Sequence, residues 1–218
     1  MLIGMELSLL TTVVIAANVL GGAMALPQAI KLVRSRRVDG VSALWAGISA
    51  TVNAWWAAYG LGIGDLSIVP VSIVSVMAYL AIAVALVRFG SAPSLRSATI
   101  VAGSAVLISA VPALALVIGG WATAGIVLGA LYGVQLSPAV VAVYRAPDVS
   151  GVSAATWSIA FAEAVLWGVY GIARPDIGLI TLAATGLAMS TLVLARLVLR
   201  RLRHDRRAGL AGWELAPV

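Results

Sequence analysis

The sequence predicts an all-α polytopic membrane protein with seven transmembrane helices, and three observations support this class. Of the 218 residues, 62% are hydrophobic and only 10% are charged, whereas a soluble domain of this size carries about 25% charged residues. Apolar runs of about 20 residues recur along the chain, and each is long enough to cross the hydrocarbon core as a helix. An internal repeat, finally, groups these runs into two sets of three with one run between them.

Seven segments are expected to cross the membrane, and the short loops between them mostly contain Gly, Pro or Asp, which are typical loop residues. An odd number of crossings places the two termini on opposite sides of the bilayer. The expected segments are 8–31, 42–62, 66–87, 98–118, 122–144, 152–172 and 177–198.

The basic residues give the orientation of the chain. All but one of the 14 Lys and Arg residues follow or end the first, third, fifth or seventh segment, and the exception is Arg174. Positive residues stay on the cytoplasmic side, so we expect the N-terminus outside and the C-terminus in the cytoplasm, in a cell membrane of the inner or plasma type. The basic tail is expected to anchor on anionic lipid rather than to bind nucleic acid.

The second half of the chain repeats the first at a constant shift of 111 residues, without a gap. The tetrapeptide "GVSA" at 40–43 recurs at 151–154. Further identical pairs are Pro27 and Pro138, Arg34 and Arg145, Trp56 and Trp167, Tyr59 and Tyr170, Gly60 and Gly171, and Asp65 and Asp176. Such a run of matches in one register indicates a duplicated unit of three helices.

The two copies are expected to be parallel, because both "GVS" loops carry the cytoplasmic charge signature. An odd number of crossings must then separate them, and one apolar segment supplies it. The expected organisation is a first repeat at 1–90, a linker helix at 91–119, a second repeat at 120–200 and a basic cytoplasmic tail at 201–218. Parallel repeats place a binding site at their interface near the bilayer midplane.

The first copy contains "LPQAIKLVRSRRVDGVS" and "WWAAYG", and the second contains "LSPAVVAVYRAPDVSGVS" and "LWGVYG". These motifs resemble those of the PQ-loop superfamily and, within it, of the SWEET sugar transporters. The resemblance covers nearly the whole chain. It implies the layout of three helices, a linker helix and three helices, and transport by alternating access between the two triplets.

The resemblance also implies that a proline on the first helix of each triplet acts as a hinge. Pro27 and Pro138 match these hinges, and proline does bend a helix because it removes one backbone hydrogen bond. Gln28 completes the Pro-Gln pair in the first copy only, since Ala139 replaces it in the second.

Substrate positions carry over in part. In SWEET transporters a tryptophan on the second helix of each triplet lines the pocket, and Trp56 and Trp167 match it here. Indole faces suit the C–H faces of a sugar. The family also has an asparagine on the third helix of each triplet, whereas the nearest residues in this chain are Ser72 and Ala183. Ser72 is therefore the candidate substrate contact at this level.

Glu163 is an acid in the middle of an apolar segment, four residues before Trp167 and so on the same helix face. A charged carboxylate there costs roughly 2.5–3.5 kcal/mol. Glu163 is expected either to face a water-filled cavity or to be protonated, because burial disfavours the charged form. Asn53 lies beside Val52, the repeat partner of Glu163, and is a candidate hydrogen-bond partner or substrate contact.

The expected function is transport of a small polar solute, with a mono- or disaccharide leading. The alternative is proton-coupled transport of an amino acid or cationic metabolite through Glu163, and a receptor or assembly protein without transport is a third hypothesis. An enzyme is not expected, because the sequence contains no nucleophile–base pair, metal-ligand cluster or phosphate-binding loop. We expect no cofactor and no metal. The expected partners are the solute and the lipid bilayer; two triplets complete one pocket, and a homo-oligomer stays open.

Overall fold

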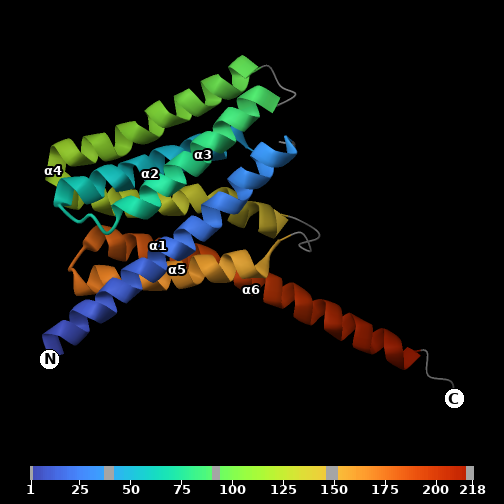
Figure 1. Ribbon diagram of the computed structural model, residues 1–218. Coiled ribbons are helices and arrows are strands. Elements are labelled where there is room, and N and C mark those ends of the chain that lie inside the picture. Colours follow the sequence, from blue (N-terminus) through green and yellow to red (C-terminus); the bar gives the residue numbers. More distant parts are fainter. Residues whose placement is uncertain (1, 37–41, 90–93, 146–151, 215–218) are drawn as a thin grey trace.

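The computed structural model describes residues 2–36, 42–89, 94–145 and 152–214, and they are almost entirely α-helical (Figure 1). Within these ranges some side chains, among them those of Pro27, Gln28 and 203–214, lie outside the description. The six helical elements are α1 (Leu2–Ser35), α2 (Ala43–Ile63), α3 (Val69–Phe89), α4 (Ser94–Arg145), α5 (Ala154–Ala173) and α6 (Ile177–Glu214).

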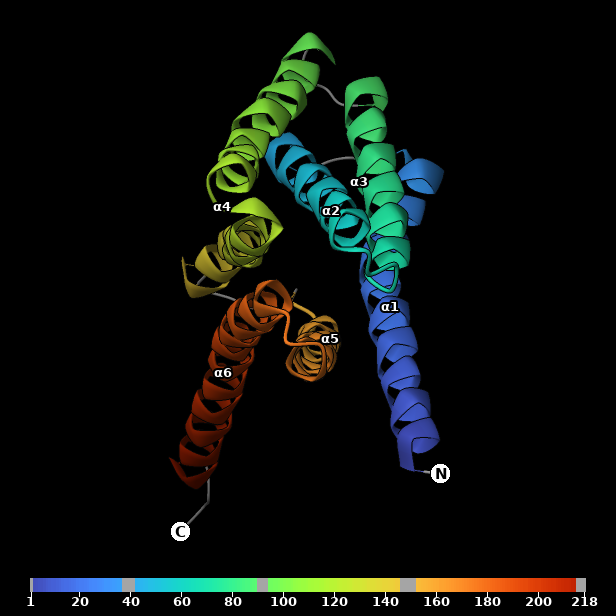
Figure 2. The same cartoon turned by 90° about the vertical axis from the view of Figure 1, so that its left-hand side faces the viewer.

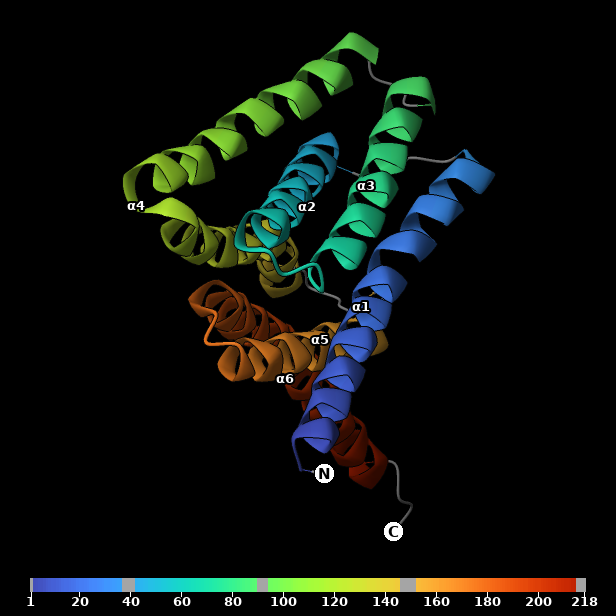
Figure 3. The same ribbon diagram turned by 60° about the vertical axis from the view of Figure 1, so that its left-hand side comes forward.

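Helix α4 consists of two helices joined by a sharp break at Gly119 and Gly120. Gly120 has φ 67° and ψ −164°, a backbone conformation that is essentially restricted to glycine. The chain reverses there, so the two halves of α4 lie at an angle to each other (Figure 3). The described residues therefore form seven helices, as the sequence predicts, and the two halves of α4 correspond to the expected segments 98–118 and 122–144.

Four of the described helices are long and apolar enough to cross a membrane by length and composition: Val69–Phe89, Ala98–Arg145, Ala154–Ala173 and Ile177–Leu202. The second of these contains the break and so holds two of the expected segments. Helix α2 does not reach this hydropathy, because it carries Asn53 and several aromatic side chains. An integral membrane protein follows from these helices, whereas the side on which each terminus lies stays a prediction.

Each triplet is built in the same way, since its first and second helices both pack against its third. In the first copy α1 and α2 contact α3, and in the second copy α4 and α5 contact α6. The copies meet where α1 contacts α5 and where α2 contacts α4. Figure 2 looks along α5, with α6 on one side of it and α1 on the other. The pairing of equivalent helices supports the duplication seen in the sequence.

The helices that follow the two "GVS" motifs begin in the same manner. Ser42 accepts a hydrogen bond from the backbone N–H of Trp45 at 3.2 Å, and Ser153 accepts one from Thr156 at 3.2 Å. Both serines are N-caps, which satisfy one of the free N–H groups at a helix start. We refer to this end of the bundle as the serine end, and to the opposite end, at Asp65 and Asp176, as the aspartate end.

Helix α6 is longer than the expected segment 177–198. It continues as one helix through Glu214, so residues 201–214 of the expected basic tail belong to the same helix as the last expected crossing. Figure 1 shows this part of α6 projecting away from the other helices. The tail therefore plays no part in the site described below.

Candidate functional site

At the aspartate end the two copies bind each other through reciprocal hydrogen bonds. The Tyr59 hydroxyl of the first copy donates to Asp176 Oδ1 of the second at 2.8 Å. The Tyr170 hydroxyl of the second copy donates to Asp65 Oδ2 of the first at 2.7 Å. Since both tyrosines and both aspartates are repeat partners, the two bonds are related by the internal repeat. They connect the triplets at this end.

Glycines allow the turns at the aspartate end to approach the helices closely. The backbone N–H of Asp65 donates to Gly60 O at 2.8 Å, and that of Asp176 donates to Gly171 O at 2.8 Å. A Cβ on Gly60 would lie 2.9 Å from Asp65 O, and one on Gly171 would lie 2.9 Å from Leu179 Cβ. Any larger residue would push the turn away from the helix.

The sequence analysis did not predict the bonds between tyrosine and aspartate. Each aspartate has a local role in its own turn, and the bond to a tyrosine of the other copy is its second role. Asp176 Oδ1 accepts from the backbone N–H of Leu179 at 3.0 Å, while Asp65 Oδ1 accepts from Ser67 N–H at 3.0 Å. The signal that could have revealed the second role is the exact repeat of the Tyr-Gly and Asp positions, which pairs them across a two-copy interface.

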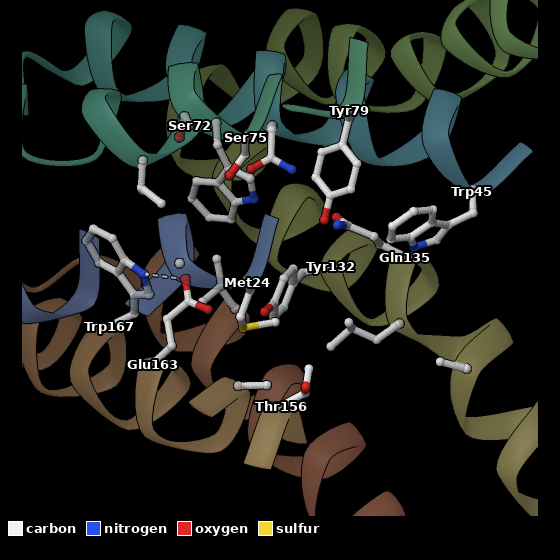
Figure 4. Close-up of a pocket in the computed structure, with 18 of the residues that line it drawn as sticks. Met24, Trp45, Ser72, Ser75, Tyr79, Tyr132, Gln135, Thr156, Glu163 and Trp167 are labelled. Carbon is white, nitrogen blue, oxygen red and sulfur yellow. Dashed lines mark hydrogen bonds between the residues drawn. The ribbon is translucent and has the colours of Figure 1, made fainter. Parts of the chain in front are cut away.

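A cavity of about 660 Å³ lies between the two triplets, a volume typical of small-molecule sites. Its walls come from both copies (Figure 4). Toward the aspartate end it reaches Trp56, Trp167, Ile68 and Leu179, beyond which the core of the interface is packed. Toward the serine end it reaches exposed residues, among them Ser42, Ala139, Ala142 and Thr156.

Trp56 and Trp167, the predicted substrate contacts, lie at corresponding places in this cavity. Each is buried and packs edge to face on the tyrosine three residues later, with ring centroids 5.4 Å apart for Trp56 and Tyr59 and 6.1 Å apart for Trp167 and Tyr170. The two tryptophans thus connect the cavity to the hydrogen bonds of the aspartate end. Breaking the hydrogen bonds of the aspartate end would therefore also displace side chains of the cavity wall.

The indole nitrogens of the two tryptophans have different environments. Trp167 Nε1 donates to Glu163 Oε1 at 3.3 Å. Trp56 Nε1 is buried and has no hydrogen-bond partner among the described residues, because the position equivalent to Glu163 is occupied by the apolar Val52. A buried donor without an acceptor is costly, so the two copies differ in how well this indole N–H is satisfied.

Glu163 lines the cavity from α5 and is half-buried. Its carboxyl group lies against α1, since a Cβ on Gly21 would be 2.5 Å from Oε1. The second carboxyl oxygen points away from Trp167, toward the side of the cavity where Met24 and Tyr132 lie (Figure 4). No Lys, Arg or His occurs among the described residues that line this cavity.

Asn53 and Ser72 also line the cavity, but their side chains bond to their own helices. Asn53 Nδ2 donates to Ser49 O at 2.8 Å, and Ser72 Oγ donates to Ile68 O at 2.9 Å. The sequence analysis gave Asn53 as a candidate hydrogen-bond partner of Glu163. The contacts of the described residues do not include this bond, and Trp167 donates to the carboxyl group instead. Asn53 lines the same cavity from the opposite triplet.

The sequence analysis did not identify several polar residues of the cavity wall. Tyr79 and Gln135 lie next to each other across the interface of the copies, near Trp45 (Figure 4). The remaining polar residues of this group are Ser75, Tyr132 and Thr156. A search for identical repeat partners overlooks them, since Met24 and Gly21 stand opposite Gln135 and Tyr132. Comparing the unlike positions of the two copies would have pointed to these residues.

The two predicted hinges are Pro27 and Pro138, and the structure describes the side chain of Pro138. Pro138 lies in the second half of α4, is exposed and lines the cavity near the serine end. The side chains of Pro27 and Gln28 lie outside the described part of the chain. Among the described residues no group of three His, Cys, Asp or Glu side chains comes close enough to hold a metal ion.

Comparison with known proteins identifies the fold. No protein-family model matches the sequence, and no curated protein matches it. Among solved structures, the chain is similar to a eukaryotic SWEET transporter solved at 3.7 Å resolution, with a TM-score of 0.63 and 16% sequence identity. The match covers 86% of this chain and 96% of the other. The predicted resemblance to SWEET transporters is thereby confirmed for the fold.

Proposed function

We propose that the protein is a membrane transporter that moves a small polar solute by alternating access between its two triplets. The observation that carries this proposal is a solute-sized cavity between two parallel repeats, blocked at one end and reaching exposed residues at the other. Reciprocal bonds from Tyr59 to Asp176 and from Tyr170 to Asp65 hold the blocked end. Breaking them while the serine end closes would give the opposite state of the same carrier.

The walls favour a ring-shaped, hydroxylated solute, so a mono- or disaccharide is the leading class. Trp56 and Trp167 offer indole surfaces for C–H faces, and Tyr79 and Tyr132 add two further rings. Hydroxyl and amide groups of Asn53, Ser72, Ser75, Gln135 and Thr156 provide hydrogen bonds around them. The residues proposed to bind solute are therefore Trp56, Trp167, Glu163, Asn53 and Ser72.

The charge distribution supports an orientation for this cycle. With basic residues on the cytoplasmic side, the serine end faces the cytoplasm and the described conformation is inward-facing, in an inner or plasma membrane. Pro27 and Pro138 are then the places where the first helix of each triplet would bend. An enzymatic role has no support, since the fold is that of a transporter family and the cavity serves binding.

Proton-coupled carriage is the second candidate, and the position of Glu163 in the cavity wall favours it. A carboxyl group that is exposed to the cavity in both conformations of a carrier can bind a proton on one side of the membrane and release it on the other. An amino acid or a cationic metabolite would then be the solute. Dependence of uptake on a proton gradient separates this candidate from a uniporter.

The test is uptake of radiolabelled glucose into liposomes that contain the purified protein, with and without an inward proton gradient. A sugar uniporter gives saturable uptake that is equal in both conditions, and liposomes without protein give the background. Uptake that appears only with the gradient supports the coupled carrier. Absence of glucose flux in both conditions contradicts the sugar assignment and directs the search to amino acids and amines.

A further inference from the structure

The pocket walls contributed by the two copies differ in chemistry, although the helices that carry them are equivalent. Glu163 of the second copy stands opposite Val52, and Asn53 of the first stands opposite Ala164. Along the third helices, α3 presents Ser72, Ser75 and Tyr79 to the cavity, whereas α6 presents Leu179 and Leu182. A cavity with one acidic site and a distant polar side fits a solute whose two ends also differ.

The acidic site has room for a further donor. Among the contacts of the described residues, Trp167 donates to one oxygen of Glu163, and the other oxygen points into the cavity (Figure 4). The groups that face this carboxyl from neighbouring helices are Gly21 on α1, Val71 on α3 and the Tyr132 ring on α4. None of them is cationic, and a carboxylate in apolar surroundings needs an ionic or hydrogen-bonding partner.

The aromatic wall near Glu163 suits a cation as well. The ring of Tyr132 lies on the same side of the cavity as the carboxyl group (Figure 4). Aromatic faces attract an ammonium group through their negative quadrupole. The carboxylate and this ring together make this side of the cavity a site for a protonated amine.

The second part of the pocket is the indole of Trp56. Its side chain lines the cavity from the other triplet, so a solute that contacts both Trp56 and Glu163 bridges the two halves of the pocket. A hydroxylated ring suits this wall, because its C–H groups can pack against an indole face.

Two other solute classes fit less well. A neutral sugar leaves the free oxygen of Glu163 without a charged partner. A zwitterionic amino acid brings a carboxylate, for which the described lining residues offer no Lys, Arg or His.

We infer that the solute is a hydroxylated ring carrying a protonated amine, an amino sugar in chemical class, whose ammonium group binds Glu163 and whose ring packs against Trp56 in the cavity wall. This inference rests on the proposed function and narrows its substrate class. It assigns the two unlike halves of the pocket to the two unlike ends of one solute.

The test is a binding titration of the full chain in lipid nanodiscs, read from its tryptophan fluorescence, with glucosamine, glucose and N-acetylglucosamine as probes. At about pH 6 the amine of glucosamine is protonated, as an α-amino group would be, whereas N-acetylglucosamine is neutral at the same position. We expect glucosamine to bind at least about tenfold more tightly than the other two, because the added bond is charge-assisted. Equal affinities of the unmodified protein for all three probes would overturn the inference.

Glu163→Gln is the matched variant, since glutamine keeps the side-chain volume and an acceptor for Trp167 Nε1. We expect the preference for glucosamine over glucose to disappear, because a neutral amide cannot form the charge-assisted bond to the ammonium group. Ser72→Ala is the control, and it should weaken glucosamine and glucose by the same factor, because this hydroxyl lies outside the acidic site. A preference that persists in Glu163→Gln contradicts the inference, and if that variant does not fold, the comparison of probes on the unmodified protein still decides.

Uptake into liposomes separates failure of this inference from failure of the proposed function. Equal flux of glucose and glucosamine would support the transport function and contradict the amine site. Tight, Glu163-dependent binding of glucosamine without any flux would support the amine site and contradict the transport function.

Discussion

The aspartate end and the cavity are made from the same two copies, yet they use the repeat in opposite ways. At the aspartate end equivalent residues make equivalent bonds, at 2.8 Å from Tyr59 to Asp176 and 2.7 Å from Tyr170 to Asp65. In the cavity, equivalent positions hold unlike residues, with Glu163 opposite Val52. Closure of two similar halves can remain symmetric, whereas recognition of an asymmetric solute requires the halves to diverge.

Trp56 and Trp167 belong to both regions, because each lines the cavity and packs on a tyrosine of the aspartate end. Both copies have tryptophan at this position, which fits the symmetric contacts of the aspartate end. Their Nε1 atoms have unlike surroundings, which fits the different walls of the cavity. They are the residues through which solute binding and closure can influence each other.

The largest effect is expected from Trp167→Ala, because it affects both regions at once. The substitution removes a cavity wall and the packing of Tyr170, and truncation of a buried tryptophan costs about 3–5 kcal/mol. Liposome uptake should fall to the background of empty vesicles. Trp55→Ala is the matched control, since Trp55 faces a separate groove between α2, α3 and α4. Loss of uptake in both variants would contradict a specific role for Trp167.

A smaller effect is expected when the turns of the aspartate end are displaced. In Gly171→Ala the new Cβ would lie 2.9 Å from Leu179 Cβ and 3.1 Å from Ile180 N, and such overpacking costs about 1–3 kcal/mol. We expect uptake to fall roughly tenfold, and Gly60→Ala should behave alike. Gly103→Ala, where a Cβ would meet nothing within 4 Å, should leave uptake unchanged. The symmetry of the closure would be refuted if Gly60→Ala and Gly171→Ala differed widely.

The smallest effect is expected from removing one hydroxyl bond at a time. Tyr59→Phe and Tyr170→Phe each delete one bond worth about 1 kcal/mol, which changes the closed-to-open ratio about fivefold. The chain contains no cysteine, so a single Ile68→Cys in the cavity wall reports access to thiol reagents from the aspartate side. Its labelling rate should rise by about the same factor in the two variants. A change in only one of them would contradict reciprocal closure.

Much of the fold could be predicted from the sequence, because it depends on signals that are local or exactly repeated. Hydropathy located the segments, and the 111-residue shift located the copies. Even the N-caps at Ser42 and Ser153 follow from the repeated "GVSA". The glycine break inside α4 fell between two predicted segments, where a loop was expected.

The site could be predicted only in part, because its contacts join residues that are far apart in sequence. Tyr59 and Asp176 are separated by 117 positions, and nothing near either residue indicates the other. Glu163 was correctly placed on the face of Trp167, since that relation lies within one helix. Among the described contacts Asn53 does not donate to Glu163. Whether it can do so depends on how α2 and α5 are arranged, which helix periodicity does not determine.

The central claim is that closure of the aspartate end alternates with its opening during transport, and cross-linking tests it most directly. In the cysteine-free chain, Tyr59→Cys and Asp176→Cys together can be bridged by a short bifunctional thiol reagent. The single variants with the same reagent serve as controls. We predict that bridging stops solute uptake into liposomes and that the unbridged double variant retains it. Equal uptake by the bridged and the unbridged protein would contradict alternating access.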